Sequence, residues 1–155
     1  MKGNKKVLES LNEALSEELT AINQYIVHSE MCENWGYDKL ATFIKKESID
    51  EMKHAEALIE RILFLEGKPV ISKLGPITIG KKVDEIHKVD TNAEADAIKK
   101  YNDTIKLAAE VGDNNTKMLL EMILKEEEEH IDWLEEQQDQ IDQIGIQLYL
   151  SRKIG

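Results

Sequence analysis

The sequence predicts an all-α protein: a bundle of four long helices, with a long crossover between the second and third and a short helix at the C-terminus. Apolar residues recur every three or four positions through four long stretches, which is the period of an amphipathic helix. Only two prolines and eight glycines occur in the 155 residues, so few positions can interrupt these stretches. Because this length is typical of one domain, we expect a single domain over residues 1–155.

The first helix is expected over residues 5–35 and the second over residues 38–66. The apolar residues that define the first are Leu8, Leu11, Leu15, Leu19, Ile22 and Ile26. Gly36 reads as its stop signal, and Gly67 with Pro69 ends the second helix. The link between them is short, so the two helices should be antiparallel neighbours.

The segment GKPVISKLGPITIG, residues 67–80, is expected to be a long connection. About 15 extended residues can span about 50 Å. A helix of roughly 28 residues is about 42 Å long. The connection can therefore cross the whole bundle, and the third helix can start at the same end as the second. A plain long loop is the alternative.

The third helix is expected over residues 83–111, where Gly112 closes it. An aspartate or asparagine at residues 113–115 can cap the fourth helix, which is expected over residues 114–144. A short tail helix follows at residues 146–152. The tight link between the third and fourth helices makes them antiparallel neighbours too.

Composition excludes several classes of protein. The net charge of −11 argues against a nucleic-acid-binding surface, which needs clustered lysine and arginine. Cys32 is the only cysteine, so neither an internal disulfide nor a four-cysteine metal site can form. No apolar run approaches the roughly 18 residues of a membrane span, and the N-terminal segment lacks the apolar core of a signal peptide. We therefore expect a cytoplasmic protein without a membrane partner.

A Glu-x-x-His motif occurs in both the second and the fourth expected helix. The two motifs are Glu51 with His54, and Glu127 with His130. Residues three apart share one helical face. Glu18 lies 33 residues before Glu51, and Glu94 lies 33 residues before Glu127. Folding each antiparallel pair would bring these glutamates level with the motifs, at the middle of the bundle.

Carboxylates at such inward positions are costly unless they are paired or bound to metal, and four of them in one core would repel each other. Two divalent cations would neutralise the four charges. Oxygen ligands with one imidazole per ion suit iron or manganese. The alternative is that all six residues lie on solvated faces.

The segments NEALSEELTAINQYIVH, ESIDEMKHAE, RILFLEGKP and EEEEHIDWLE resemble the bacterioferritin family, over nearly the whole chain. The resemblance implies a ferritin-like domain with a di-iron centre, twenty-four subunits in a hollow shell, and haem b at each two-fold dimer contact. By this resemblance, Glu18 and Glu94 are terminal iron ligands and Glu51 and Glu127 bridge the two ions. His54 and His130 each complete one ion.

The function implied by the resemblance is iron storage and detoxification. The enzyme would be a ferroxidase that oxidises Fe²⁺ to Fe³⁺ with O₂ or H₂O₂ and stores ferric mineral, and haem would aid iron release with a ferredoxin-type reductant. The alternatives are a catalytically silent shell subunit or another ferritin-like di-metal oxidase or peroxidase. A rubrerythrin-like protein needs a four-cysteine iron domain, which a single cysteine excludes. A manganese enzyme stays an alternative, because the same ligand types suit manganese and iron.

Met52 lies about 100° around the helix from Glu51 and should point away from the metal site. The resemblance makes it an axial ligand of haem iron, together with its two-fold mate. The alternative is a methionine that packs at a dimer contact without haem. Lys45 stands where some relatives carry an aromatic residue near the haem, so the haem contacts are expected to differ.

Other residues near the pattern have smaller roles. Tyr25 shares a face with Glu18, and the resemblance places it beside the metal site. Tyr101 stands in the same relation to Glu94 and is expected to satisfy a polar neighbour. Lys46 replaces a histidine that helps hold an inner-surface iron in some relatives. The remaining expectations are that Trp133 packs, His28 and His87 are ordinary polar or interface histidines, and Met118 and Met122 fill the core.

Overall fold

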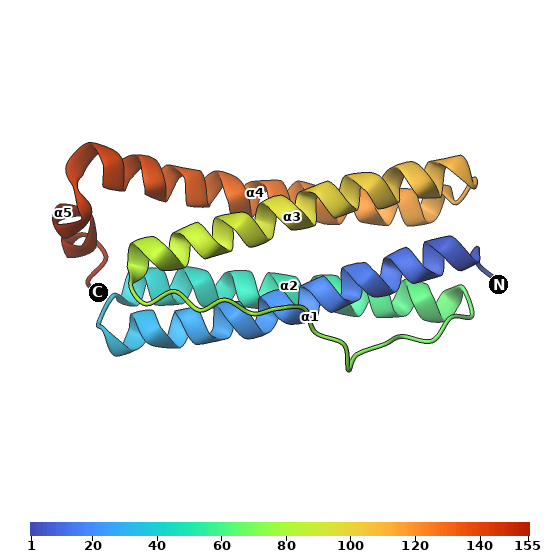
Figure 1. Ribbon diagram of the computed structural model, residues 1–155, viewed down its shortest axis with the longest axis horizontal. Coiled ribbons are helices and arrows are strands. Elements are labelled where there is room, and N and C mark those ends of the chain that lie inside the picture. Colours follow the sequence, from blue (N-terminus) through green and yellow to red (C-terminus); the bar gives the residue numbers. More distant parts are fainter.

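The computed structural model describes residues 1–155 and confirms the all-α four-helix bundle. The helices are α1 (Lys5–Asn34), α2 (Asp38–Phe64), α3 (Val83–Glu110), α4 (Asn114–Ile144) and the short α5 (Ile146–Ser151). Figure 1 shows α1 beside α2 and α3 beside α4, each pair antiparallel and joined by a short link. The crossover returns along the bundle, so α3 starts at the same end as α2 and runs parallel to it.

The helix ends follow from local backbone chemistry. The Asn4 side chain accepts hydrogen bonds from two backbone N–H groups in the first turn of α1, which have no partner within the helix. Gly36 and Gly112 follow α1 and α3 with φ of 82° and 75°, a conformation that glycine adopts without strain. Helix α2 ends at Phe64, before the expected residue 66, because Glu66 has a left-handed φ of 59°.

The crossover, residues 65–82, is fixed along α1 by a row of polar side chains that we call the α1 ladder. The ladder consists of Asn12, Ser16, Thr20, Gln24 and His28. Asn12 hydrogen-bonds to backbone groups of both Lys68 and Val70. The other four each bond one backbone group: Ser16 that of Lys73, Thr20 that of Gly75, Gln24 that of Thr78, and His28 that of Gly80. Residues four apart lie on one face of a helix. The ladder therefore satisfies the backbone of an irregular segment that has no secondary structure of its own.

Two apolar clusters fill the interior on either side of a polar layer. One cluster includes Leu11, Leu58 and Leu120, and the other includes Ile44 and Ile86. Each of these side chains is at most 1% exposed. Burying one such side chain stabilises the fold by about 1.5–3 kcal/mol. The clusters set the helices at fixed heights relative to one another, and this register positions the polar layer between them.

The expectation that Met118 and Met122 fill the core is wrong, because their side chains are 59% and 65% exposed. The buried face of α4 runs through Leu120, Ile123 and Glu127. The two methionines lie on the opposite side of the helix. Their spacing of four predicts that they share a face, but it does not predict which face.

The end of the bundle near α5 is closed by aromatic and polar contacts. His87 is buried, and its Nε2 lies 2.9 Å from the Tyr149 hydroxyl of α5. Burial lowers the pKa of His87 to about 4, so the imidazole is neutral inside the bundle. Trp133 packs as expected, with its ring stacked on Phe43 at a centroid distance of 4.0 Å. No helix combines the length and the apolar character needed to cross a membrane.

We predict that Gly80→Ala destabilises the protein. A Cβ atom at Gly80 would lie 2.5 Å from the backbone nitrogen of Ile86, so the crossover or the first turn of α3 must shift. Overpacking of this kind costs about 1–3 kcal/mol. Each kcal/mol lowers the thermal midpoint by roughly 2–4 °C. Gly75→Ala is the matched control, because its Cβ atom would lie 3.6 Å from Thr20 Oγ1. Equal midpoints for the two variants would contradict the prediction.

Candidate metal centre

The six side chains predicted as metal ligands lie in the polar layer between the two apolar clusters. They are Glu18 of α1, Glu51 and His54 of α2, Glu94 of α3, and Glu127 and His130 of α4. None of the six is more than 6% exposed. Glutamate is almost never fully buried without a partner. Because each Glu-x-x-His motif spans one helical turn, both of its side chains reach the interior together.

These residues form two overlapping groups. The first group is Glu18, Glu51, His54 and Glu127, and the second is Glu51, Glu94, Glu127 and His130. In each group, one possible ligand atom per residue lies within 4.8 Å of the others. Only Glu51 and Glu127 belong to both groups. The geometry therefore suits these two carboxylates to bridge two cations, while each remaining residue serves one cation.

Each of the six residues has one buried polar atom without a hydrogen-bond partner. These atoms are Glu18 Oε2, Glu51 Oε1, His54 Nδ1, Glu94 Oε2, Glu127 Oε1 and His130 Nδ1. An unsatisfied buried polar atom costs about 1–3 kcal/mol, and more if it is charged. Six such atoms gathered in one layer fit a centre that binds cations, because cations would satisfy all of them at once.

The two histidines aim one ring nitrogen at the carboxylates and the other at the neighbouring motif helix. His54 Nδ1 lies 2.9 Å from Glu127 Oε1, and its Nε2 contacts Glu126. His130 Nδ1 lies 3.0 Å from Glu51 Oε1, and its Nε2 lies 3.2 Å from Asp50 Oδ2. The residues directly before Glu51 and Glu127 therefore contact the outer nitrogens of the histidines on the opposite helix. A carboxylate in this position orients a metal-binding imidazole and increases its basicity.

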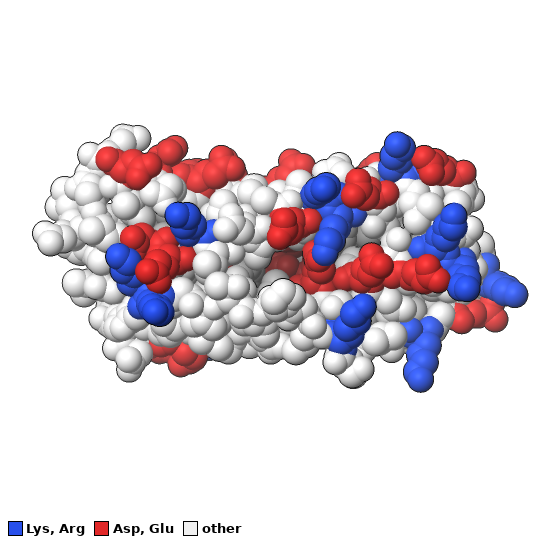
Figure 2. Space-filling model, viewed as in Figure 1, with Lys and Arg blue, Asp and Glu red and all other residues white.

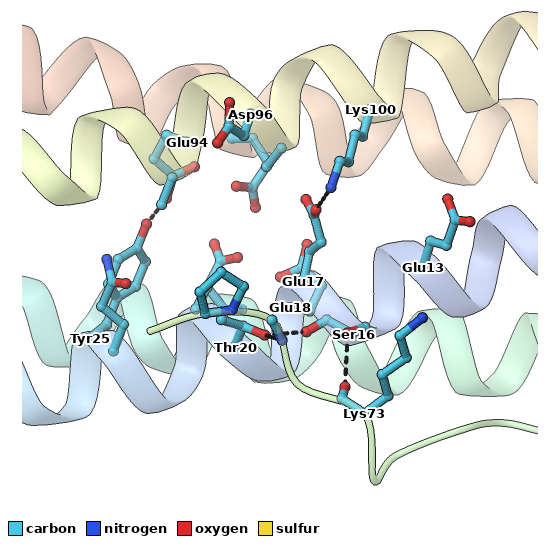
Figure 3. Close-up of a pocket in the computed structure, with 18 residues that line it drawn as sticks. Glu13, Ser16, Glu17, Glu18, Thr20, Tyr25, Lys73, Glu94, Asp96 and Lys100 are labelled. Carbon is cyan, nitrogen blue, oxygen red and sulfur yellow. Dashed lines mark hydrogen bonds and ion pairs between the residues drawn. The ribbon is translucent and has the colours of Figure 1, made fainter. Parts of the chain in front are cut away.

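Two buried tyrosines form hydrogen bonds with Glu18 and Glu94 across the bundle. Tyr25 of α1 donates a hydrogen bond to Glu94 of α3, and Tyr101 of α3 donates one to Glu18 of α1 (Figure 3 shows the first). Both hydroxyls are fully inside, and burial followed by the charge of the contacted glutamate raises the pKa of each. Each phenol therefore remains protonated and fixes Oε1 of its glutamate, while Oε2 of the same glutamate has no hydrogen-bond partner.

Comparison with known proteins identifies the family of the chain. A family model described as a ferritin-like domain matches residues 8–144. The chain is 44% identical to a bacterioferritin of Mycobacterium bovis over 155 residues, which is 100% of this chain and 98% of the relative. It is 47% identical to a bacterioferritin of Rhodobacter capsulatus over 147 residues, which is 95% of this chain and 91% of the relative.

The chain belongs to the bacterioferritin family. The resemblance seen in the sequence is thereby confirmed. Membership supports a role in iron storage, and the buried carboxylate and imidazole groups are able to hold metal ions.

A second network, which sequence reasoning missed, lies one turn before Glu94 in this bacterioferritin-family chain. Asp90 Oδ1 accepts a hydrogen bond of 2.8 Å from the Gln24 amide and lies 2.9 Å from His28 Nδ1. Because His28 Nε2 accepts the backbone N–H of Gly80, its proton sits on Nδ1 and is donated to Asp90. The α1 ladder is thus connected to the helix that carries Glu94. The sequence signal for this network was the spacing of four residues between Asp90 and Glu94, which places both on one face of α3.

The pKa values of Glu51, Glu94 and His54 are all raised, which favours their protonated forms when no cation is bound. Burial, with the charge of neighbouring Glu18, raises the pKa of Glu51. Burial and the charge of Glu127 raise the pKa of Glu94 to about 8. Burial lowers the pKa of His54, but contacts with Glu127 and Glu18 outweigh it and raise the value to about 11. Cations must displace protons from this layer when they bind.

Two cavities reach the centre from opposite sides of the bundle. The larger, about 570 Å³, opens between α1 and α3, and we call it the α1–α3 cleft (Figure 3). Its inner wall is formed by all four central glutamates, Glu18, Glu51, Glu94 and Glu127. The smaller cavity, about 280 Å³, lies between α2 and α4 and includes Asp50, Glu126 and His130. Lys46 also lines it, with its ammonium 5.9 Å from the Phe43 ring.

Met52 lies outside the metal centre. Its side chain is 46% exposed, whereas its neighbour Glu51 is 2% exposed. Lys45, two turns earlier on the same face of α2, is also exposed. The exposed thioether is therefore available to a second molecule or a ligand at the surface.

We predict that Glu94→Gln stabilises the metal-free protein at alkaline pH. The pKa of Glu94 is raised above its unfolded value of 4.5 to about 8, so its charged form opposes folding. The parent should gain stability as the pH falls from about 8 toward 4.5 and Glu94 takes up its proton. At pH 9 the glutamine variant should exceed the parent in free energy of unfolding by up to about 5 kcal/mol, because each unit of raised pKa corresponds to about 1.4 kcal/mol.

Urea denaturation in the presence of a chelator measures this difference. The advantage of the variant should shrink as the pH approaches 5. Glu110→Gln is the control, because Glu110 is an exposed residue of the same helix and the change in net charge is the same. An advantage of Glu94→Gln that is constant from pH 5 to pH 9 would refute the assignment.

Proposed function

We propose that the chain is the ferroxidase subunit of an iron-storage shell. It binds two Fe²⁺ ions within one subunit, oxidises them to Fe³⁺ with O₂ or H₂O₂, and stores the ferric product as mineral inside the shell. The observation that carries this proposal is the layer of six unsatisfied buried ligand atoms, one from each predicted residue. A catalytically silent shell subunit has no need of such a costly layer.

In this proposal the six residues bind the substrate iron. Glu18 and Glu94 are terminal ligands, and Glu51 and Glu127 bridge, as their membership of both groups supports. His54 and His130 complete one ion each. Two adjacent ferrous ions give one electron each to H₂O₂, and two protons are taken up as two waters form. Two metal ions held side by side favour this two-electron reduction.

The residues around the ligands position them and exclude water. Asp50 and Glu126 hold the outer nitrogens of the two histidines, and Tyr25 and Tyr101 hold one oxygen of each terminal glutamate. The apolar clusters on either side keep the layer at low dielectric, which strengthens its attraction for divalent cations. Protons released on metal binding leave the glutamates and histidines in their ligating forms.

The proposed assembly is a cytoplasmic shell of twenty-four subunits built from two-fold dimers, as the family resemblance implies. Met52 would be the axial ligand of haem b at the dimer contact, together with the Met52 of a second copy. Its exposed thioether, turned away from the metal centre, fits a haem held at the subunit surface. When bound, the haem would carry electrons from a ferredoxin-type reductant toward the stored iron.

We predict that Glu127→Ala slows the oxidation of Fe²⁺ by about a hundredfold or more, because loss of an orienting group alone costs 10–100-fold and Glu127 would touch both ions. The assembly should remain intact, since removing one buried carboxylate also relieves repulsion. Stopped-flow absorbance after addition of Fe²⁺ measures the rate. Glu128→Ala, an exposed neighbour on the same helix, is the control. Equal rates in parent and Glu127→Ala would refute the ferroxidase proposal.

We predict that Met52→Leu removes the haem absorption band without slowing the first round of Fe²⁺ oxidation. Leucine keeps the apolar volume but has no sulfur to ligate iron. Met118→Leu serves as the control, since Met118 is also an exposed methionine at 59%. Retention of the band in Met52→Leu would contradict the ligand assignment and leave the metal centre unaffected.

A further inference from the structure

The α1–α3 cleft joins the protein surface directly to the four central glutamates. Each of the four carries one oxygen without a hydrogen-bond partner and is at most 2% exposed. All four line the cleft: Glu18, Glu51, Glu94 and Glu127. A cation moving inward along this wall meets carboxyl oxygens that make no hydrogen bond.

The outer part of the cleft is acidic. Glu13 and Glu17 of α1 and Asp96 of α3 line it, and we call these three residues the acidic mouth. Glu13 and Asp96 are exposed and Glu17 is half-buried, whereas Glu18 and Glu94 are buried (Figure 3 labels all five). Figure 2 shows acidic side chains gathered over the same part of the bundle, with lysines beside them. Carboxylates that line a cleft raise the local concentration of cations.

The opposite side of the centre is chemically different. The cavity between α2 and α4 reaches only one predicted ligand, His130, and none of the four central glutamates. The outer imidazole nitrogens on that side are occupied by contacts with Glu126 and Asp50. The four central glutamates thus line the α1–α3 cleft, whereas the outer nitrogens of the two histidines, in contact with Glu126 and Asp50, lie toward the other side.

Lys100 spans the acidic mouth. Its ammonium, carried by α3, forms an ion pair with Glu17 of α1, drawn as a dashed line in Figure 3. Contact with Glu17, together with the charges of Asp96 and Glu13, raises the pKa of Lys100 and keeps it protonated. The side chain is 57% exposed, so no packing prevents it from swinging out. Lys100 therefore places an exposed monovalent cation among the three carboxylates of the acidic mouth.

We propose that the α1–α3 cleft admits Fe²⁺ to the centre and that Lys100 gates it, by pairing with Glu17 until a divalent cation displaces the ammonium. This inference rests on the proposed function, because it takes the six-residue centre as the destination. Divalent ions compete better than monovalent ones for three carboxylates, so the gate favours Fe²⁺ over K⁺ or Na⁺. The crossover, held by the α1 ladder, supplies Lys73, Gly75 and Pro76 as the fixed side of the opening.

The test measures the rate at which Co²⁺ reaches the centre of the assembled protein, followed by its visible absorbance without any turnover. Lys100→Ala should bind Co²⁺ about two- to fivefold faster than the parent, which is the range expected when one exposed ion pair is lost. The final amount of Co²⁺ bound should not change. Glu13→Gln combined with Asp96→Asn should slow the uptake, because the mouth then attracts the ion less.

The matched control is Lys99→Ala, which removes the same charge from an exposed neighbour outside the cleft. Equal acceleration by Lys99→Ala and Lys100→Ala would overturn the gate, since overall charge would then explain both. Unchanged uptake in Lys100→Ala would overturn it too. Unchanged uptake in the double mouth variant would overturn the route. A parent protein that binds no Co²⁺ at its centre would instead overturn the proposed function as well.

Discussion

Four carboxylates buried at one level of the bundle impose the constraint on which the rest of the structure depends. Without cations the layer is tolerable only because protons and tyrosine hydroxyls take up part of its charge. Burial of the two apolar clusters, one on each side of the layer, offsets the free energy that the buried carboxylates cost. The interior is therefore arranged as apolar, polar and apolar in turn. Each long helix contributes one glutamate to the middle, so a shift of any helix along its axis would disturb the whole layer.

Most of the fold could be predicted from the sequence because its signals are local. The apolar period of 3.6 residues marks the helices, glycines at 36, 112 and 145 mark their ends, and the two short links make each pair antiparallel. The six candidate ligands could be brought to one level because Glu18 to Glu51 and Glu94 to Glu127 have the same spacing. The structure has these six side chains in one layer, and their roles as ligands stay a prediction.

The remaining features depend on side-chain direction across helices, which no spacing within one helix reveals. Glu126 belongs to no motif and its side chain is half exposed, yet it contacts His54 on another helix. Asp50 reaches His130 in the same way. Met118 and Met122 have the spacing of core residues but lie on the exposed face, because spacing shows that two residues share a face and does not show which face is buried. The positioning residues of the centre were therefore the hardest to identify, although they are adjacent in sequence to the ligands.

The α1 ladder has a consequence for how this chain can vary. Surface connections usually accept insertions and deletions at little cost. Here the crossover is hydrogen-bonded to five side chains of one rigid helix, from Asn12 to His28. Adding or removing one residue would move every later backbone group away from the side chain that it bonds. His28, the last residue of the ladder, also contacts Asp90, which lies one turn from Glu94. Indels in this stretch should therefore be selected against as strongly as changes in the core, despite its position on the outside of the bundle.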